Sequence, residues 1–446
     1  MQRRILPFRR AQAWRAFRKF TWGGDWALSL STQIKYNLYW FFFDGLFASA
    51  SDNIIVTYLT LYILALGATR AQVGLMSSFS SLSAALLLLP GAILVERYGH
   101  RKELILSLGG GIARLTILIL ALLPLFLGGL SIVWVAISLS VLRDAFGNLA
   151  FPAWMSVTAD IVPMEGRGRY FGSRNFVMGI AGILAILFVG ELITNSSQPL
   201  GYQIALGLAF TLGMLSTFSF GQIRDPKGQS PIKAGSSLSF KAVLQDMKLH
   251  PVFIALSLVM ALWNFSLNIA GPFFNVYMVQ NLKFSASMVG ITSIVTTVAS
   301  LFIQRRVGRI SDRLGPRKVQ IICMFLIPIL PFVWMFITKP WHVIILNSFS
   351  GVLWGAFNLV SFNFLLSLTP DAQRARYSAF FQILVMLALA GGAAVGAWVV
   401  TKWGYQAIFL SSAIGRLITG ILFLRFVRAE GGDSEFNNPQ YPDDGS

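Results

Sequence analysis

Three charged side chains inside apolar segments are the residues best able to do chemistry in this sequence. Asp52 lies in the apolar run 39–66, and the neighbours Arg143 and Asp144 lie in the run 131–158. Placing each charge within a bilayer would cost about 2.5–3.5 kcal/mol on translocon scales. A carboxylate at such depth can take up and release a proton, and a guanidinium can bind an anion or tune a neighbouring acid. These three residues are therefore candidates for function.

The composition indicates a protein embedded in a lipid bilayer. The 446 residues are 55% hydrophobic and only 12% charged, whereas soluble domains carry about 25% charged residues. Cys323 is the single cysteine, and the histidines His100, His250 and His342 are dispersed. No nucleotide-binding loop or zinc-protease motif occurs. We therefore expect no metal, no cofactor and no enzyme activity.

Twelve apolar runs are each near the roughly 20 residues that a membrane helix needs. Each should be a helix, because lipid offers the backbone no other hydrogen-bond partners. The sequence thus predicts an all-α polytopic membrane protein. The expected spans are 39–66, 72–95, 103–127, 131–158, 172–194, 202–222, 252–281, 286–304, 319–338, 341–368, 378–400 and 405–427.

Polar segments divide these spans into two halves. Residues 224–250 form the longest polar connection and separate a predicted bundle at 37–223 from a second at 251–428. The basic, aromatic segment 1–36 has no apolar core of signal-peptide length; it is either a helix on the membrane surface or an unstructured tail. The acidic segment 429–446 should be disordered.

The basic residues predict the orientation of the chain. Most of the 36 lysines and arginines lie in the tails and loops on the side of the N-terminus, and such an excess marks the cytosolic side. Both termini should therefore be cytosolic, in a plasma (inner) membrane. The net charge of +18 is explained by this topology, so a nucleic-acid partner is not expected.

Three landmarks show that the two halves are repeats. The run Glu96-Arg-Tyr-Gly-His-Arg-Lys102 is followed 216 residues later by Asp312-Arg-Leu-Gly-Pro-Arg-Lys318. Val73-Gly74 recurs at the same offset as Val289-Gly290, and the Pro163–Tyr170 run resembles Pro370–Tyr377. Landmarks that keep their order at a nearly constant offset indicate two homologous six-helix bundles.

These motifs resemble the major facilitator superfamily over residues 37–428. Gly308, Asp312, Arg313, Gly315, Arg317 and Lys318 match the loop signature of that superfamily between spans eight and nine. The first copy departs from it, with Glu96 in place of Asp and His100 in place of Arg. Span five has Gly179 and Gly182 but no Gly-Pro pair, so the antiporter signature is absent. The run 167–175 resembles a poorly characterised prokaryotic group.

The resemblance implies a cytosolic gate built from charged loop residues. Ion pairs at this end would lock the cytosolic side when the site opens outward, although the charges could also serve only to hold the loops in the cytosol. In the first half the implied gate residues are Glu96, Arg97, Arg101, Asp160, Arg167 and Arg169. In the second half they are Asp312, Arg313, Arg317, Asp371, Arg374 and Arg376.

The resemblance also places spans one, four, seven and ten around a central cavity. Arg143 and Asp144 are adjacent on a helix and should point in different directions, which leaves Arg143 free to meet Asp52 or a substrate anion. Three roles remain open for the group: a proton carrier at Asp52 or Asp144, a counter-ion for an anionic substrate, or a structural ion pair. Arg114 and Arg416 should be structural or should reach toward the membrane surface.

The cavity spans of the second half offer amides and aromatic rings instead of acids. Asn264, Asn268 and Asn275 lie near one face of span seven, which Gly271-Pro272 should kink. Trp354 and Asn358 form a similar face on span ten. These groups suit a neutral polar or amphipathic organic ligand, or else they join helices by amide hydrogen bonds.

The function that the sequence favours is secondary active transport of a small organic solute by alternating access, coupled to protons, in a monomer. An uncoupled facilitator is one alternative. A transporter-like receptor or assembly subunit without transport is another.

Overall fold

The computed structural model describes residues 19–224, 251–368 and 374–427. The described residues are almost all helical and contain no strand. The segments 1–18, 225–250, 369–373 and 428–446 lie outside them. These segments contain the first half of the predicted N-terminal segment, nearly all of the predicted central loop, the acidic tail and Asp371. Contacts group the chain into unit 1, Met1–Gly235 with Pro272–Ile294, and unit 2, Ser236–Gly271 with Val295–Ser446.

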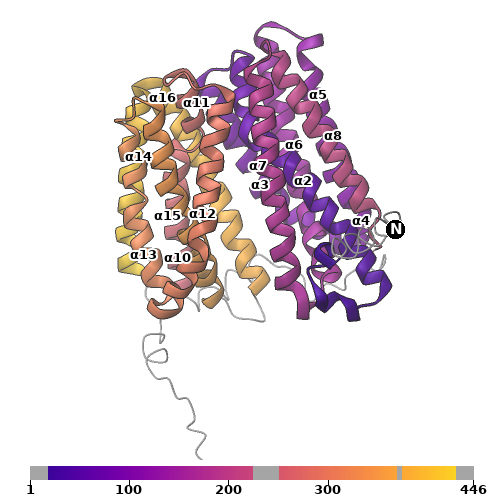
Figure 1. Ribbon diagram of the computed structural model, residues 1–446. Helices are drawn as coiled ribbons and strands as arrows, with labels where there is room; N and C mark the ends of the chain where they lie inside the picture. The colour runs from indigo at the N-terminus through magenta and orange to yellow at the C-terminus, as the bar shows by residue number, and fades with distance from the viewer. Residues whose placement is uncertain (1–18, 225–250, 369–373, 428–446) are drawn as a thin grey trace, which may run out of the picture. The chain divides into compact units, whose positions relative to one another are not determined.

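Unit 1 contains the first six membrane spans (Figure 1). Its helices are α2 (Thr32–Ala65), α3 (Arg70–Tyr98), α4 (Arg101–Leu104), α5 (Ala113–Phe126), α6 (Gly129–Ile161), α7 (Arg167–Thr194) and α8 (Leu200–Gly221). Helix α2 packs against α7 and α8, α3 packs against α6, and α5 packs against both α6 and α8. The helix α2 is therefore central to the unit and carries both Asp44 and Asp52.

Local sequence signals set the helix ends of unit 1. Ser31 accepts a hydrogen bond from the Ile34 amide and caps the start of α2. Thr69 and Gln72 form a capping box at the start of α3. Gly99 ends α3 at φ 65°, a left-handed conformation that costs glycine little. Gly99 therefore ends span two inside the charged loop motif, before span three begins.

The third span differs from its prediction as a plain helix. Between α4 and α5 lies η3 (Ile105–Ile112), a π-helix that contains three consecutive glycines at 109–111. Such segments are rare, and they frequently mark functional sites, because they alter the helical register of the residues that follow. Arg114 follows η3 directly, at the second residue of α5.

Unit 2 contains most of the second repeat. Its helices are α10 (Pro251–Ala270), α12 (Ala286–Leu314) from Val295 onward, α13 (Pro316–Leu326), α14 (Ile329–Trp334), α15 (Pro340–Ser367) and α16 (Arg374–Phe426). Helix α10 packs against α16, and α13 packs against both α15 and α16. Gly404, at φ 79° and ψ −171°, divides α16 into the two predicted last spans.

The membrane spans agree with prediction in number and differ at their ends. Eleven segments of the described chain are long and apolar enough to cross a membrane, and the last, Tyr377–Phe426, contains two spans. The predicted kink at Gly271-Pro272 is confirmed, because α10 ends at Ala270 and α11 (Phe273–Gln280) begins after it. Helix α12 continues ten residues beyond its predicted end and carries the loop motif on its last turns.

Residues 272–294 of the second repeat pack with the first repeat. Helix α11 contacts α2 and α3. Arg70 Nε donates to Gln280 Oε1 at 3.1 Å, and the Ser287 amide donates to Thr194 Oγ1 at 3.1 Å. These contacts lie at the end of α2 and α7 that is remote from the Arg-rich turns. We call the end of unit 1 with the α3–α4 and α6–α7 turns the basic end of unit 1, and the end of unit 2 with the α12–α13 turn the basic end of unit 2.

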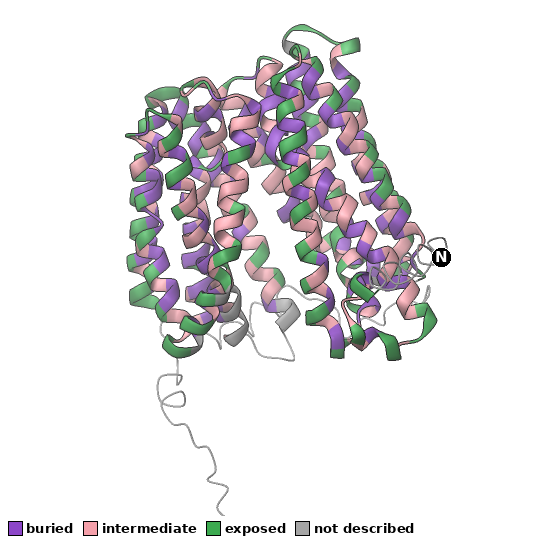
Figure 2. Ribbon diagram, in the orientation of Figure 1, coloured by how far each residue is buried: buried purple, intermediate pink, exposed green. Residues whose placement is uncertain are grey.

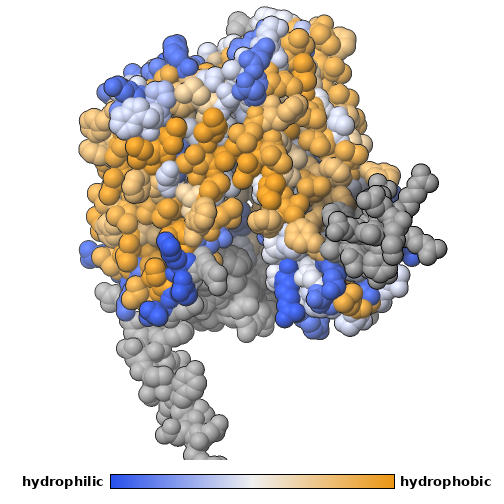
Figure 3. Space-filling model, viewed as in Figure 1, coloured by the Kyte–Doolittle hydropathy of each residue, from blue (hydrophilic) through white to orange (hydrophobic). Residues whose placement is uncertain are grey.

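The helix surfaces carry the apolar residues expected of lipid contact. Phe302 is 80% exposed and Phe126 is 78% exposed, and buried residues alternate with exposed ones around each helix (Figure 2). On the face shown in Figure 3, hydrophobic residues cover the length of the helices and hydrophilic residues gather near their ends. This distribution is what a protein with lipid as its lateral solvent requires.

Candidate functional site

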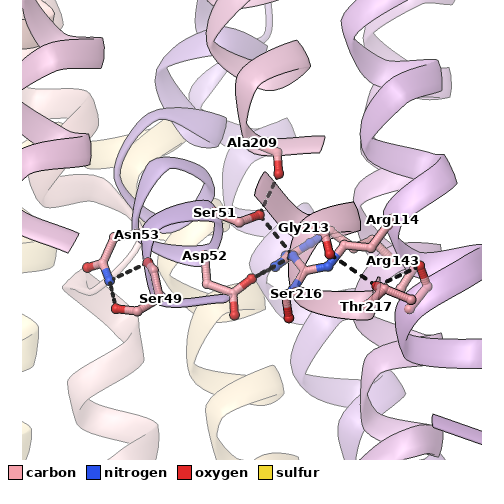
Figure 4. Close-up of polar contacts among 12 residues, drawn as sticks. Ser49, Ser51, Asp52, Asn53, Arg114, Arg143, Ala209, Gly213, Ser216 and Thr217 are labelled. Carbon is pink, nitrogen blue, oxygen red and sulfur yellow. Dashed lines mark hydrogen bonds and ion pairs between the residues drawn. The ribbon is translucent and has the colours of Figure 1, made fainter. Parts of the chain in front are cut away.

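The centre of the site is the carboxylate of Asp52 on α2. Arg114 Nη1 on α5 donates to Asp52 Oδ1 at 2.8 Å and to Ser51 Oγ at 3.0 Å (Figure 4). Arg143 Nη2 on α6 lies 4.0 Å from the same Oδ1 atom. The Asp52 side chain is 47% exposed, whereas those of Arg114 and Arg143 are 13% and 19% exposed. A half-exposed carboxylate therefore faces two mostly buried cations.

Asp144 completes this group and corrects one prediction. Arg143 Nη1 donates to Asp144 Oδ1 at 2.8 Å. The prediction that these neighbours point in different directions is wrong, because the long Arg143 side chain curls back along α6 to reach the shorter one. Asn148 Nδ2 donates to the Asp144 carbonyl. Arg143 thus touches Asp144 while it also lies near Asp52, and we call Asp52, Arg114, Arg143 and Asp144 the charge cluster.

Close packing directs Arg114 toward Asp52. A Cβ on Gly213 of α8 would lie 2.7 Å from Arg114 Cδ, so the glycine makes room for the arginine stem. Ser51 Oγ donates to the Ala209 carbonyl of α8 at 2.7 Å, which fixes its remaining lone pairs toward Arg114. Thr217 Oγ1 bonds the carbonyls of Gly110 and Gly213 and joins α8 to η3. The expectation that Arg114 is structural or reaches toward the membrane surface did not specify Asp52 as its partner.

A second carboxylate on α2, Asp44, has a closed environment. Arg174 Nη2 of α7 lies 3.4 Å from Asp44 Oδ2, and Ser216 Oγ of α8 donates to Oδ1 at 2.7 Å. The Arg174 guanidinium also lies over the Phe41 ring at 4.1 Å and donates to the Phe41 carbonyl at 3.0 Å. Both charged side chains are at most 8% exposed. Sequence reasoning did not predict this pair, because Asp44 and Arg174 lie on helices that are far apart in sequence.

One predicted gate pair of the first repeat is present at the basic end of unit 1. Arg101 Nη1 lies 2.7 Å from Asp160 Oδ2 and 2.9 Å from Ser156 Oγ, and Arg101 is 2% exposed. Arg167 instead donates to the Ala159 and Val162 carbonyls and so caps the end of α6. Arg97 and Arg169 are exposed. The side chain of Glu96 is not among those that the structure describes.

The second repeat uses its basic residues differently where the structure describes them. Arg317, at the position equivalent to Arg101, donates from Nε to the Val427 carbonyl at 2.7 Å and caps α16. Lys102 does the same for α8 by donating to the Gly221 carbonyl. Arg313 is exposed. The side chains of Asp312, Arg374 and Arg376 lie outside the described part of the chain, as does Asp371.

The predicted cavity amides lie in both units. In unit 2, Asn264 Nδ2 bonds the Met260 carbonyl of its own helix, and Asn268 Nδ2 donates to the Leu389 carbonyl of α16 at 2.7 Å. Asn268 therefore joins two helices, as one of the two predicted alternatives requires. Trp354 and Asn358 are half-buried and exposed, respectively, on α15. Asn275 belongs to α11 in unit 1.

Residues 19–31 pack against the basic end of unit 1. Trp22, Trp26 and Leu30 contact a buried cluster that includes Val162 and Tyr170. The Trp26 ring occupies the space that a Cβ on Gly166 would need, at the turn between α6 and α7. The start of the described chain therefore covers the turn that carries Arg167.

The sequence matches the profile of the Major Facilitator Superfamily over residues 41–303 and 259–441. The "Multi-drug resistance efflux pump PmrA" of Streptococcus pneumoniae is 24% identical over 392 residues, which cover 85% of this chain and 93% of that protein. The "Multidrug resistance protein MdtG" of Serratia proteamaculans is 22% identical over 399 residues, covering 87% and 92%.

Solved transporter structures share the fold at low sequence identity. A crystal structure of a D-xylose-proton symporter has a TM-score of 0.68 at 14% identity and covers 87% of this chain and 97% of its own. The nucleoside transporter NupG has a TM-score of 0.66 at 14% identity, covering 88% and 99%.

Proposed function

The chain belongs to the Major Facilitator Superfamily, and from that premise we propose that it carries amphipathic organic solutes across the membrane by proton-coupled alternating access. Membership makes it a transporter of small molecules with twelve membrane helices. The coupling ion, the substrate class and the orientation are the proposed parts. The observation that carries them is the charge cluster, in which Asp52 is both exposed and within reach of two arginines.

The proposed coupling step is an exchange of partners inside the cluster. Deprotonated Asp52 holds Arg114 at 2.8 Å and attracts Arg143, which is 4.0 Å away. A proton on Asp52 would cancel that attraction and leave Arg143 to Asp144, its partner at 2.8 Å. Because the two acids compete for one cation, a proton on either changes which helices are held together. The shift would bias packing between α2, α5 and α6.

The relatives suggest the substrate class. Two proteins named for multidrug resistance align over more than four fifths of this chain, and this likeness favours export of lipophilic organic compounds. Span five lacks the Gly-Pro pair, so its contact with span one should differ from the one that the antiporter signature makes. Gly182 and Gly190 of α7 pack closely on Asn53 and Tyr58 of α2. The amides and aromatic residues at Asn264 and Trp354 are the proposed substrate contacts of the second repeat.

The proposed orientation places the basic end of each unit in the cytosol, because Lys and Arg accumulate there. The Arg101–Asp160 pair would then belong to the cytosolic gate, with Arg167 fixing the neighbouring helix end. At the opposite end, the Arg70–Gln280 and Ser287–Thr194 hydrogen bonds join the two repeats within unit 1. These two bonds would have to break when the site opens outward.

An uncoupled facilitator is the second candidate, and one observation favours it. Asp52 already has a cationic partner at 2.8 Å, so it can remain ionised throughout the cycle and serve only to join α2 to α5. In that case substrate would move down its own gradient without a proton.

Proton flux in liposomes separates these candidates. Purified protein would be reconstituted into vesicles that contain the pH dye pyranine, and ethidium would be added outside as a lipophilic test solute. We expect ethidium movement to change the internal pH in the wild type, and the change to be lost in Asp52→Asn. Ethidium flux without a pH change would support the facilitator. An absence of flux for ethidium and for a panel of lipophilic dyes, in folded protein, would contradict the proposed substrate class.

A further inference from the structure

Arg416 is a buried cation that the transport cycle above does not use. It lies on α16 and is 3% exposed, and its Nε atom has no hydrogen-bond partner among the described residues. Ser412, Thr419 and Phe423 are buried on the same face of the helix, at helical spacings from Arg416. The guanidinium therefore points into the interior of unit 2 rather than toward lipid. A buried charge without a partner is strongly unfavourable unless something neutralises it.

Unit 2 provides no acid that can reach Arg416 among its described residues. The one acid in the segments 251–271, 295–368 and 374–427 is Asp312, which precedes Arg317 at the basic end of unit 2. Arg317 binds the Val427 carbonyl, and Arg416 lies eleven residues before Val427, or about 16 Å away along the helix. An arginine side chain does not span that distance. The charge must therefore be balanced by something other than a described carboxylate.

The first repeat also holds an arginine among the equivalent spans, although it is on span three rather than on the last span. Arg114 is 13% exposed among α2, α5 and α8, and Asp52 neutralises it at 2.8 Å. The repeat offset of 216 residues pairs Asp52 with Asn268, a neutral amide that bonds the Leu389 carbonyl. The second repeat thus keeps a buried arginine among its equivalent spans, α10, α13 and the last span of α16, but lacks the carboxylate.

A second unpartnered donor lies at the depth of Arg416. Ser412 Oγ donates to the Ser266 carbonyl, which sets the level at which α10 meets the last span of α16. These two spans are antiparallel. Trp263 lies three residues before Ser266, about 4.5 Å along α10, and Arg416 lies four residues after Ser412, about 6 Å along α16, so both are displaced in the same direction. Trp263 is fully buried, and its Nε1 has no hydrogen-bond partner among the described residues. Two buried donors at one depth favour an anion.

The packing limits the size of that anion. A Cβ on Gly415 would lie 2.6 Å from Ser266 Oγ, and one on Gly420 would lie 3.3 Å from the Met324 carbonyl. Helices that pack this closely on both sides of Arg416 favour a small anion over a phosphate or an organic acid. We infer that Arg416 binds a small monovalent inorganic anion of chloride size inside unit 2, which balances its charge as Asp52 balances that of Arg114 in unit 1.

Thermal unfolding of the purified full chain tests this inference. The midpoint would be measured in sodium chloride, sodium bromide and sodium gluconate at equal ionic strength. We expect chloride and bromide to raise the midpoint saturably and gluconate, which is too large to enter, to have no such effect. Arg416→Met should abolish the halide response, and Lys402→Met, which removes an exposed cation of the same unit, should retain it.

Three results would overturn the inference. Equal midpoints in chloride and gluconate would show that water, rather than an anion, completes the site. A halide response that persists in Arg416→Met would place the anion elsewhere. If that variant does not fold, Ser412→Asp provides the second test, because it puts a carboxylate four residues before Arg416 on the same helix face. Ser412→Asp should fold without needing halide, and a full halide response in it would contradict the inference.

Discussion

Asp44 and Asp52 lie eight residues apart on α2, about 12 Å along one helix, and both pair with an arginine. The Asp44 and Arg174 side chains are 8% and 5% exposed, and Ser216 and the Phe41 carbonyl satisfy their other groups. Asp52 is 47% exposed, with one cation at 2.8 Å and a second at 4.0 Å. One carboxylate has a complete set of partners, and the other has alternative ones.

This difference separates a structural ion pair from a group that can change state. Loss of the charge on Asp44 would leave Arg174 uncompensated in a buried site. Asp52 is more exposed and has a second cation 4.0 Å away, so its ion-pair partners can be exchanged. Two carboxylates on one helix can therefore have opposite roles, and the roles are set by the neighbours on α5, α6, α7 and α8.

The largest expected effect is on transport by Asp52→Asn. The variant should exchange solute across liposomes at a near wild-type rate but fail to accumulate it against a gradient, because no proton can be exchanged at that position. Accumulation and counterflow of ethidium would be measured in the same preparation. Uphill transport at the wild-type level would remove Asp52 from the coupling step, and Asp144→Asn would then be tested in the same way.

The next largest effect is on stability, and it belongs to the other carboxylate. Asp44→Asn should lower the free energy of unfolding by about 3–5 kcal/mol, because it leaves the Arg174 charge buried and unpaired. Thermal unfolding in detergent would measure the loss. The double variant Asp44→Leu with Arg174→Met serves as the control and should recover most of the stability. Equal thermal unfolding midpoints for Asp44→Asn and Asp52→Asn would contradict the proposed difference between the two carboxylates.

A matched pair of glycine substitutions should give a smaller version of the same contrast. A Cβ at Gly45 would lie 2.5 Å from the Arg174 guanidinium, and one at Gly213 would lie 2.7 Å from Arg114 Cδ. Gly45→Ala should lower the free energy of unfolding by about 1–3 kcal/mol, because the buried Asp44–Arg174 pair cannot move away from the added methyl group. Gly213→Ala should unfold at a midpoint closer to the wild type and instead alter coupled transport, because the more exposed Arg114 can move away from Asp52. The reverse order of the two midpoints would contradict this account.

Much of the fold was predictable because lipid imposes a strong pattern. Apolar runs of helical length gave the twelve spans, and the repeated loop motif gave the two halves. Helix ends were less predictable: α12 extends through Arg305 and Arg309, since charged residues at a membrane surface can remain helical. The π-helix at 105–112 had a signal in its three glycines, but glycines alone do not specify that geometry.

Three of the four members of the charge cluster were predictable from the sequence, but the contacts among them were not. Asp52, Arg143 and Asp144 stood out because charges are costly in a membrane. The contact of Arg114 with Asp52 was not foreseen, because it depends on Gly213 and Ser51, which are distant in sequence or neutral. Arg174 was hidden because Tyr170 and the loop arginines around it made it look like a surface charge. Residue spacing along one helix does not predict which side chains of other helices will contact it.

Infrared difference spectroscopy of the purified protein tests the central claim most directly, because it observes carboxyl protonation without needing a substrate. Spectra would be recorded as the pH is lowered in steps over the range in which the protein stays folded, in the wild type, Asp52→Asn and a stable control that lacks the Asp44–Arg174 pair, Asp44→Leu with Arg174→Met. The account predicts a protonated-carboxyl band that is lost in Asp52→Asn and retained in the control. A band that survives in Asp52→Asn and disappears from the control would contradict it.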